Sequence, residues 1–117
     1  LAQTIITTAA GLQMKGTFTG LRNLRFKETD RIKALEKELT ALGASIKADD
    51  NSILLEAASL EIKRKVRVYA DHRMAMSFAP LSILLGEIAI DSPAVVAKSY
   101  PSFWEDLKSV GFQIIED

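Results

Sequence analysis

The stretch NLRFKETDRIKALEKELTALG, residues 23–43, decides how the rest of the chain is interpreted. Its first nine residues hold three cations, two carboxylates, an amide and a hydroxyl. From Thr29 or Asp30 onward, apolar residues recur at helical spacing, which predicts a helix that ends at Gly43. Because backbone N–H groups at a helix start attract anions, the cluster favours a small anionic ligand. A solvated, charged helix start is the alternative.

This helix is predicted to have one buried face and one hydrated face. The buried stripe consists of four apolar residues: Ile32, Leu35, Leu39 and Leu42. The charged residues expected mostly to face water are Lys33, Glu36, Lys37 and Glu38. We interpret the stripe as core rather than as part of a cofactor site.

Composition limits the function classes. The 117 residues carry 15 basic and 15 acidic side chains, so broad binding to nucleic acid or a membrane surface is not expected. The lack of cysteine excludes disulfides, a thiolate nucleophile and cysteine-ligated metals, and it is compatible with a cytoplasmic location. The sequence opens at Leu1 in the middle of a helical pattern, so we expect a segment of a longer protein.

Elsewhere the pattern alternates between short helices and strands. Further helices are expected over 1–14, 71–85 and 101–110. Strands are expected over 17–21, 44–47, 53–56, 66–69, 87–91 and 112–115. The strands 44–47 and 53–56 should form a hairpin, and 92–99 should be a loop or extended segment.

Several residues are expected to shape or fill the core. Pro80 should kink or split the helix 71–85 because it has no N–H to donate. The inward residues of the three further helices are expected to be Ile5, Ala9 and Leu12; Met74, Phe78, Leu81 and Leu85; and Phe103, Leu107 and Val110. Ile88 and Ile90 should point inward from their strand.

The order of elements indicates an α/β (α+β) fold in which helices pack against mixed sheets. Two further polar clusters, Asp71-His72-Arg73-Met74-Ala75-Met76 and Lys98-Ser99-Tyr100-Pro101, stand near predicted element ends. The helix starts could therefore converge on one edge of the fold.

Five candidate cations lie in the three clusters: Arg25, Lys27, Arg31, Arg73 and Lys98. Arginine binds carboxylate or phosphate with a planar fork, whereas lysine acts as a compact charge. Together they could hold a small polyanion. For each cation, an ion pair with a nearby carboxylate remains an equal alternative.

Glu28 and His72 are the candidate acid–base groups. A glutamate beside a histidine can move a proton in either direction. A lone histidine is more often structural, and Asp71 could simply cap the following helix. No glycine-rich phosphate loop, His-Glu-x-x-His motif or cysteine pair is present, so a nucleotide or metal enzyme is not supported.

The segments at 25–31, 71–76 and 98–104, taken together, resemble the C-terminal part of the 5-enolpyruvylshikimate-3-phosphate synthase family, the 3-phosphoshikimate 1-carboxyvinyltransferases of aromatic amino-acid biosynthesis. The resemblance extends along nearly the whole chain. It implies a domain built from βαβαββ units, with residues 1–117 forming the C-terminal part of the second of two domains. The N-terminal domain and an aspartate general base before Leu1 would be absent.

The resemblance also implies residue roles. Asn23 and Lys27 match positions that bind shikimate 3-phosphate around its reacting hydroxyl. Phosphoenolpyruvate would be bound by Arg31, Arg73 and Lys98. Catalytic roles fall to Glu28, Lys27 and His72, with Glu28 moving the proton at the methylene carbon and His72 supporting it.

The implied reaction adds the 5-hydroxyl of shikimate 3-phosphate to phosphoenolpyruvate and then eliminates phosphate. No metal or organic cofactor is implied. The expected partners are the two substrates and the missing N-terminal domain, with no nucleic acid and no membrane, and the chain alone is expected to be inactive. Two alternatives stay open: a fragment of the related UDP-N-acetylglucosamine enolpyruvyl transferase, and a non-catalytic binding module.

Overall fold

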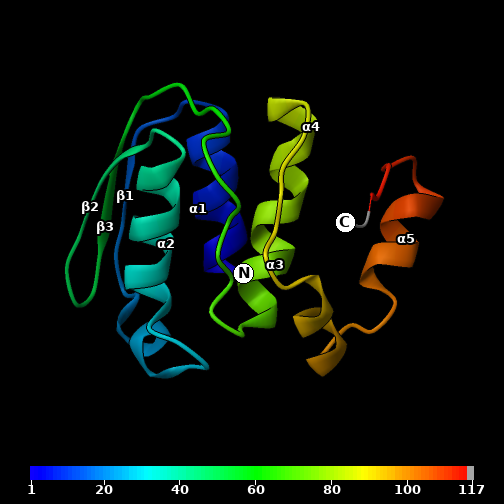
Figure 1. Cartoon of the computed structure of the whole chain (residues 1–117). Helices are drawn as coiled ribbons and strands as arrows, with labels where there is room; N and C mark the ends of the chain where they lie inside the picture. Colours follow the sequence, from blue (N-terminus) through cyan, green and yellow to red (C-terminus); the bar gives the residue numbers. More distant parts are fainter. Residues whose placement is uncertain (116–117) are drawn as a thin grey trace.

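The computed structural model describes residues 1–115 and contains five α-helices, three strands and three 3₁₀ helices in that range (Figure 1). Within it, no helix is both long enough and apolar enough to cross a membrane. The elements in chain order are α1 (Ala2–Gly11), β1 (Gly16–Phe18), η1 (Arg22–Phe26), α2 (Arg31–Ala41), β2 (Ser45–Ala48), β3 (Ile53–Glu56), α3 (His72–Phe78), η2 (Ala79–Leu81), α4 (Ser82–Leu85), η3 (Pro93–Lys98) and α5 (Phe103–Ser109).

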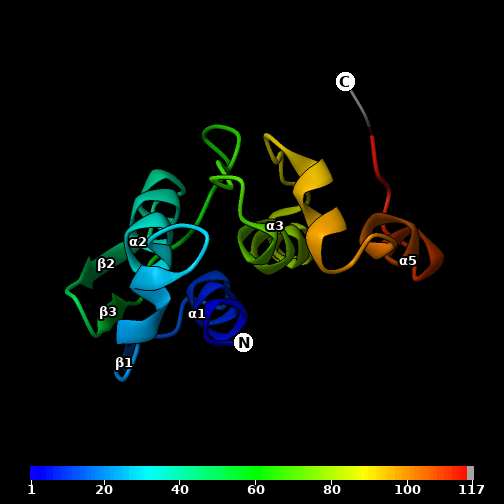
Figure 2. The ribbon, with the colours of Figure 1, turned by 90° about the horizontal axis from the view of Figure 1, so that it is seen from below.

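The elements are stacked side by side. Seen from below, the sheet lies at one side, followed by α1 and α2, then α3, and finally α5 (Figure 2). One cluster of buried apolar residues runs from the sheet through α1 and α2 to α3 and η3. This arrangement agrees with the predicted class, in which helices cover sheet.

Helix α2 matches its prediction most closely. Its predicted stripe is fully buried, with exposed fractions of at most 2%: Ile32, Leu35, Leu39 and Leu42. The Asp30 carboxylate caps the helix by accepting a hydrogen bond from Lys33 N at 3.2 Å. Gly43 follows with φ of 105°, a conformation that residues with a Cβ adopt poorly. The start, end and buried face are therefore confirmed.

Glu38 is the exception on α2. It was expected to face water, but its exposed fraction is 1%. The expectation is wrong because the chain at 64–69 folds back over this side of the helix and donates hydrogen bonds to the carboxylate. A buried carboxylate needs such donors, since desolvation without them is costly.

The three strands form an antiparallel sheet in the order β1-β3-β2. The predicted hairpin is confirmed, with Ser45 opposite Glu56 and Ala48 opposite Ile53. In β3, Ile53 and Leu55 are buried while the alternate residues are exposed, so one face covers the core. The first strand ends at Phe18 rather than reaching Leu21, and Gly20 follows with φ of 73°.

The mixed sheet expected further along the chain is reduced to one contact. Val66 and Ile90 form an isolated parallel bridge, in which Val66 N donates to Ala89 O at 2.8 Å. The strands predicted over 66–69, 87–91 and 112–115 are therefore wrong as regular strands. Within residues 1–115 no third extended segment pairs with the bridge, and a ladder needs neighbours to be stable.

The predicted helix over 71–85 is divided at Pro80, as expected. It becomes α3, the 3₁₀ turn η2 and α4, because Pro80 cannot donate the i→i−4 hydrogen bond. Its predicted apolar face is largely confirmed: Met74, Phe78 and Leu81 are buried and Leu85 is half-buried. Ile88 and Ile90 are half-buried against the same cluster. The segment 92–99, expected to be a loop or extended, forms η3 instead.

Helix α1 exists as predicted but presents a different face. Ile6 and Ala10 are buried, whereas Ile5 and Leu12 remain about half exposed, so these two were wrongly placed in the core. A Cβ on Gly11 would lie 2.7 Å from Leu81 Cδ2, which indicates that α1 turns its glycine face toward η2. The predicted face instead lines an open groove with Phe18.

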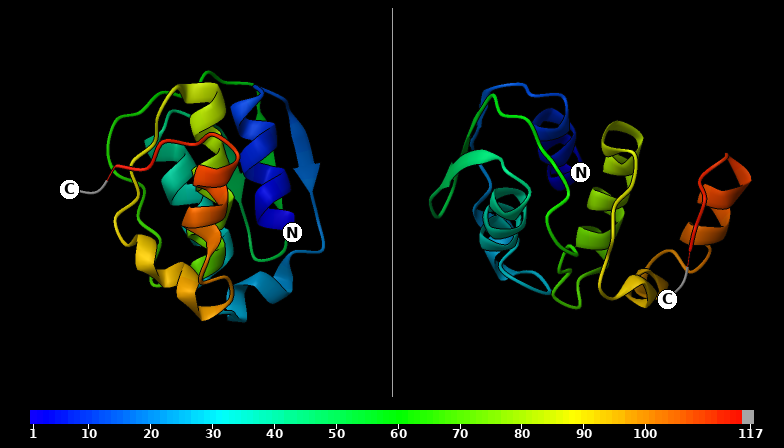
Figure 3. Two further views of the ribbon diagram at one scale, coloured as in Figure 1. Left: turned by 90° about the vertical axis from the view of Figure 1, so that its right-hand side faces the viewer. Right: turned by 45° about the horizontal axis from the view of Figure 1, so that its top comes forward.

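Helix α5 stands apart from the rest. Figure 3 shows it separated from α3 and α4, with the η3 segment between them. Phe103 and Leu107 are half-buried, and Val110, which was expected to be buried, is 72% exposed. It is joined to η3 by a hydrogen bond from Trp104 Nε1 to Pro93 O at 2.8 Å.

Candidate active site

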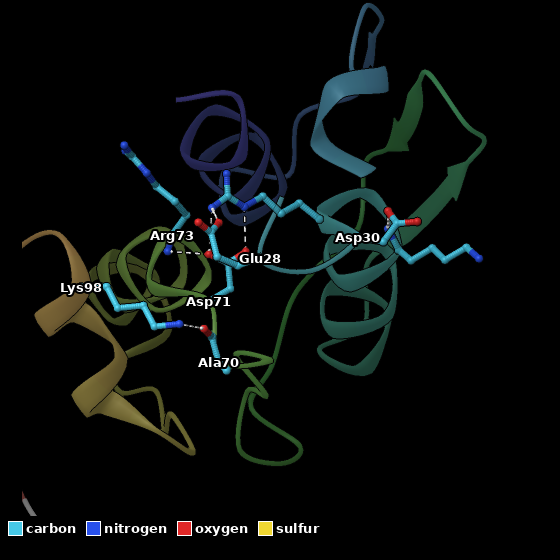
Figure 4. A network of polar contacts seen from close by, with 8 residues as sticks. Glu28, Asp30, Ala70, Asp71, Arg73 and Lys98 are labelled. Atoms are coloured by element: carbon cyan, nitrogen blue, oxygen red, sulfur yellow. Dashed lines mark hydrogen bonds and ion pairs between the residues drawn. The ribbon is translucent and has the colours of Figure 1, made fainter. Parts of the chain in front are cut away.

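The three polar clusters come together at one end of the molecule. The first cluster spans η1 and the start of α2, the second opens α3, and the third begins at the last residue of η3. Arg31 of the first cluster binds Asp71 of the second, and Lys98 of the third donates to Ala70 O at 3.1 Å. These contacts bring the starts of α2 and α3 beside the end of η3 (Figure 4).

A buried ion pair joins the first two clusters. Arg31 donates from Nε to Asp71 Oδ2 at 2.7 Å and from Nη2 to Asp71 Oδ1 at 3.0 Å. Asp71 is fully buried, and Arg31 is 6% exposed. Removing one partner of such a pair leaves an uncompensated charge, which costs about 3–5 kcal/mol. The ion-pair alternative therefore holds for Arg31.

Asp71 has a second role. Its Oδ1 accepts a hydrogen bond from Arg73 N at 2.9 Å and so caps α3. The predicted cap is confirmed. One carboxylate thus sets both where α3 begins and how that start lies against α2.

Glu28 lies in the turn before α2, next to the same guanidinium. Arg31 Nη2 donates to Glu28 Oε2 at 2.5 Å, and the Glu28 side chain keeps 41% of its surface exposed. The carboxylate is therefore held in place from one side and open to solvent on the other. A group that exchanges protons with a ligand needs both properties.

His72 adds a second proton-transfer group. It is 9% exposed, and its Nδ1 is buried with no hydrogen-bond partner among the described residues. One nitrogen of His72 and one oxygen each of Glu28 and Asp71 all lie within 4.8 Å of one another. The predicted pairing of Glu28 with His72 is geometrically possible.

These three donors also have the geometry of a metal site, but their environment disfavours one. The Arg31 guanidinium already binds both carboxylates. A divalent cation between them would have to displace a buried positive charge or lie beside it. The arrangement therefore suits proton transfer and anion binding better than metal binding.

The remaining cations of the three clusters differ in whether their side chains already have a hydrogen-bond or ion-pair partner. The side chains of Lys27 and Arg73 are exposed and make no hydrogen bond or ion pair among residues 1–115. Lys98 is exposed and binds only the carbonyl of Ala70. These three can meet an anion without first breaking an ion pair.

Arg25 and Asn23 make no hydrogen bond or ion pair with Glu28, Asp71 or His72 among the described residues. Arg25 pairs with Asp50 at 3.4 Å and stacks 5.3 Å from the centre of the Phe26 ring. Its other acidic neighbour, Asp30, lies on the side of α2 away from Glu28 (Figure 4). Asn23 is exposed on η1, and its side chain makes no hydrogen bond within the described part of the chain. The structure does not bring Arg25 into the cluster around Glu28.

The sequence analysis missed two residues that support this site. The half-buried Tyr69 donates from Oη to the buried Glu38 carboxylate at 2.5 Å, and Tyr69 stands two residues before Asp71. Glu38 follows Arg31 by seven residues, a spacing that puts both on one face of α2. That spacing was the only sequence signal for a role of Glu38 at the site. It becomes informative only once the structure shows that residues 64–71 cover this face of α2.

Comparison with known proteins supplies the family. A family model described as EPSP synthase (3-phosphoshikimate 1-carboxyvinyltransferase) matches residues 1–107. The chain belongs to the EPSP synthase family. The resemblance inferred from the three motifs is confirmed. EPSP synthase abbreviates the family name used above.

Individual members of the EPSP synthase family are similar along nearly the whole chain. The 3-phosphoshikimate 1-carboxyvinyltransferase of Bacteroides fragilis is 46% identical over 117 residues, which cover 97% of this chain and 28% of that protein. The enzyme of that name from Methanospirillum hungatei is 37% identical over 110 residues, or 94% of this chain and 25% of that protein. The chain therefore spans only about 28% of the length of the first of these relatives.

Solved structures agree with this assignment. An EPSP synthase from Acinetobacter baumannii superposes with a TM-score of 0.80 at 26% identity. The match covers 94% of this chain and 26% of that one. The fold described above is therefore the fold of one part of an EPSP synthase.

Proposed function

We propose that the chain is part of a 3-phosphoshikimate 1-carboxyvinyltransferase. The enzyme would transfer the enolpyruvyl group of phosphoenolpyruvate to the 5-hydroxyl of shikimate 3-phosphate and release phosphate. The observation that carries the proposal is the meeting of Glu28 and His72 beside exposed cations, in a chain of this family. Residues 1–117 would form the C-terminal part of the second domain.

Binding of two phosphorylated substrates is assigned to the exposed cations. Arg73 and Lys98 would bind phosphoenolpyruvate, Arg73 through its planar fork and Lys98 as a point charge. Lys27 and Asn23, both exposed near the start of α2, would bind shikimate 3-phosphate around its 5-hydroxyl. Neither the Arg73 nor the Lys27 side chain is engaged with a carboxylate within residues 1–115, which supports this assignment.

Arg31 receives a narrower role than the resemblance alone suggests. Its Nε and Nη2 are bound to Asp71 and Glu28, and Nη1 is the nitrogen left for a ligand. Arg31 would contribute one hydrogen bond to phosphoenolpyruvate through Nη1. Its larger effect would be to hold Glu28 and Asp71 in place.

The proton transfers are assigned to Glu28, with His72 in support. The 5-hydroxyl oxygen attacks C2 of phosphoenolpyruvate and gives its proton to a general base in the rest of the enzyme, while C3 gains a proton, which gives a tetrahedral intermediate. Phosphate then leaves C2, and C3 loses a proton. A group at C3 must therefore both donate and accept, and a partly exposed glutamate next to a histidine can do so. Lys27 and the other cations would stabilise the phosphate that departs.

The rest of the enzyme would complete the site. The relatives are more than three times as long as this chain, and the groove beside Ile5 and Leu12 leaves apolar surface that further chain could cover. We assign this partner role to the same protein's N-terminal domain and place the reaction in the cytoplasm. Without that domain, orientation and water exclusion are lost, so the chain alone should not turn over.

Kinetics of the full-length protein test the proposal. Glu28→Gln should lower kcat/KM for phosphate release at least ~100-fold, since an acid–base group contributes about 10²–10⁴. Arg73→Ala should also lower it at least ~100-fold, because each hydrogen bond to a charged group contributes about 1.5–3 kcal/mol. Glu36→Gln is the matched control, because the Glu36 carboxylate binds Ala48 N of β2 and not the site, and this variant should stay within a few fold of the wild type. If the two site variants also stay within a few fold, the chain is a binding module whose clusters are surface ion pairs.

A titration tests the division between this chain and the rest of the enzyme. The chain alone is titrated with phosphoenolpyruvate and shikimate 3-phosphate, and then mixed with the missing N-terminal portion. We expect phosphate release only in the mixture. Turnover by the chain alone would contradict the assignment of a shared site.

A further inference from the structure

The turn just before the second polar cluster has an unusual backbone. Tyr69 and Ala70 have φ of 56° and 54°, in the left-handed region that residues with a Cβ avoid. Asp71, the residue that caps α3 and binds Arg31, follows at once. Backbone strain of this kind persists only where the surrounding structure holds it.

Helix α2 supplies much of that hold. The Glu38 carboxylate accepts hydrogen bonds from Tyr69 Oη at 2.5 Å and from Arg67 N at 2.9 Å. Seven residues earlier on the same helix, Arg31 binds Asp71. One helix therefore holds the chain on both sides of the left-handed turn.

Contacts from other elements complete the attachment. Val68 N donates to Asp91 Oδ1 at 3.1 Å, and Lys98 Nζ donates to Ala70 O at 3.1 Å. Each of the residues from 67 to 71 thus has its backbone or side chain bound to a distant part of the chain. Among the partners that these five residues bind within residues 1–115, Glu38 is the one that offers a buried carboxylate and contacts two of them, Arg67 and Tyr69.

Charge and protonation both favour the Glu38 contact. Arg64 Nη1 lies 3.1 Å from Glu38 Oε1 and compensates the buried negative charge. Burial, together with the hydrogen bond to Glu38 and its charge, raises the pKa of Tyr69 to about 12. The tyrosine hydroxyl therefore keeps its proton and donates throughout the neutral range.

We propose that Glu38 and Tyr69 are positioning residues for the active site, because they hold the left-handed turn that sets His72 beside Glu28 and places Arg73 in the first turn of α3. The proposal rests on the function proposed above. Neither residue reaches the substrate; they act through the start of α3. Because the turn carries the phosphoenolpyruvate-binding side of the site and not Asn23 or Lys27, its displacement should affect the two substrates unequally.

Steady-state kinetics of the full-length protein test this inequality. Glu38→Gln should lower kcat about tenfold or more and raise KM for phosphoenolpyruvate about tenfold, because small displacements of a positioned group cost up to about 10²-fold. KM for shikimate 3-phosphate should change less than twofold. Glu36→Gln is the matched control: the Glu36 carboxylate also accepts a backbone N–H, from Ala48 at 3.1 Å, but does not contact the turn.

A milder pair of variants keeps the test decisive if Glu38→Gln does not fold. Tyr69→Phe deletes only the hydroxyl and should raise KM for phosphoenolpyruvate about threefold. Adding Ala70→Gly should restore most of the loss, because glycine adopts the left-handed conformation without strain. A purely structural role would not give this rescue, nor a KM effect confined to one substrate.

Three outcomes overturn the proposal. One is a Glu38→Gln enzyme with unchanged kinetics, another is an equal rise of both KM values, and the third is a Tyr69→Phe loss that Ala70→Gly does not relieve. Arg73→Ala is measured in parallel. If Arg73→Ala is inactive and Glu38→Gln is normal, only the positioning role fails. If Arg73→Ala is fully active, the proposed function fails with it.

Discussion

The regions around α2 and α5 differ in how well their helices are covered. Both helices follow from the same 3.6-residue pattern, yet the four stripe residues of α2 are at most 2% exposed and no residue of α5 is buried. Helix α2 has the sheet on one side and α1 with the 64–71 segment on others, whereas α5 touches the core only through half-buried residues such as Phe103 and binds η3 by one hydrogen bond (Figures 1 and 3). An amphipathic pattern thus predicts a helix, but burial requires an opposing surface.

A buried ion pair of α2 and an exposed ion pair of α5 should differ most in their contribution to stability. Asp71→Asn keeps an oxygen to cap α3 but removes the buried carboxylate that binds Arg31, which then keeps only the partly exposed Glu28. It should lower the free energy of unfolding by about 3–5 kcal/mol. In α5, the exposed pair of Glu105 and Lys108 at 3.2 Å offers the comparison, and Glu105→Gln should cost about 0.5 kcal/mol or less. Urea unfolding followed by circular dichroism measures both. Similar losses would remove the distinction between the regions.

Core truncation should sharpen the comparison at the apolar positions. Leu39→Ala in α2 removes a fully buried side chain and should cost about 2–5 kcal/mol. Leu107→Ala in α5 removes a half-buried one and should cost about 1 kcal/mol. Thermal denaturation of the two variants beside the wild type is the measurement. A Leu107→Ala loss as large as that of Leu39→Ala would show that α5 is packed more tightly than its exposure indicates.

The helix caps provide a smaller test. Asp30 accepts a hydrogen bond from Lys33 N, so Asp30→Ala should cost about 1 kcal/mol. Ser102 occupies the same position before α5 but its side chain makes no capping hydrogen bond, and Ser102→Ala should change stability by less than about 0.5 kcal/mol. The urea unfolding midpoints of the two variants measure these losses. A larger loss for Ser102→Ala than for Asp30→Ala would contradict the assigned caps.

The smallest expected difference is in how the free energy of unfolding changes at high pH, and it concerns the two tyrosine–carboxylate pairs. The pKa of Tyr69 is raised from its ordinary 10.0 to about 12, so the folded state retains a proton that the unfolded state loses above pH 10. Its contribution to stability is complete below pH 10 and is lost as the pH rises toward and past 12. Tyr69→Phe should remove that part of the pH dependence.

Tyr100 is the control for this titration. Its hydrogen bond to Asp106 also raises its pKa, but the group is exposed beside α5. Tyr100→Phe should therefore alter the high-pH slope of the unfolding free energy less than Tyr69→Phe does, because solvent screens an exposed pair. The reverse order would mean that Tyr69 is more accessible than the structure indicates.

Much of the local structure was predictable from the sequence. The period of apolar residues indicated α2 and its face, the polar turn indicated the hairpin, and Pro80 indicated the break after α3. The three polar clusters indicated an anion site and the family. Each of these signals depends on residues close together in the chain, where helix period, turn preference and a missing N–H act directly.

Other features depended on contacts between distant segments. The 66–69 and 87–91 segments have strand-like sequences but form only one bridge. An alternating pattern of apolar residues predicts an extended segment, but it does not show which other segments will pair with it to form a stable sheet. Arg25 and Arg31 are equivalent as candidate cations, yet Arg31 binds Asp71, forty residues away, while Arg25 faces Asp50. No local pattern distinguishes them.

The sequence by itself determined that this protein has an amphipathic helix ending at Gly43, a β-hairpin after it and three polar clusters typical of one enzyme family. The tertiary structure decided which face of α1 is buried, that Glu38 lies inside, and that Asp71 joins α2 to α3. The physical reason is common to all three. Burial and pairing are set by the surface that another part of the chain presents, and that surface exists only after folding.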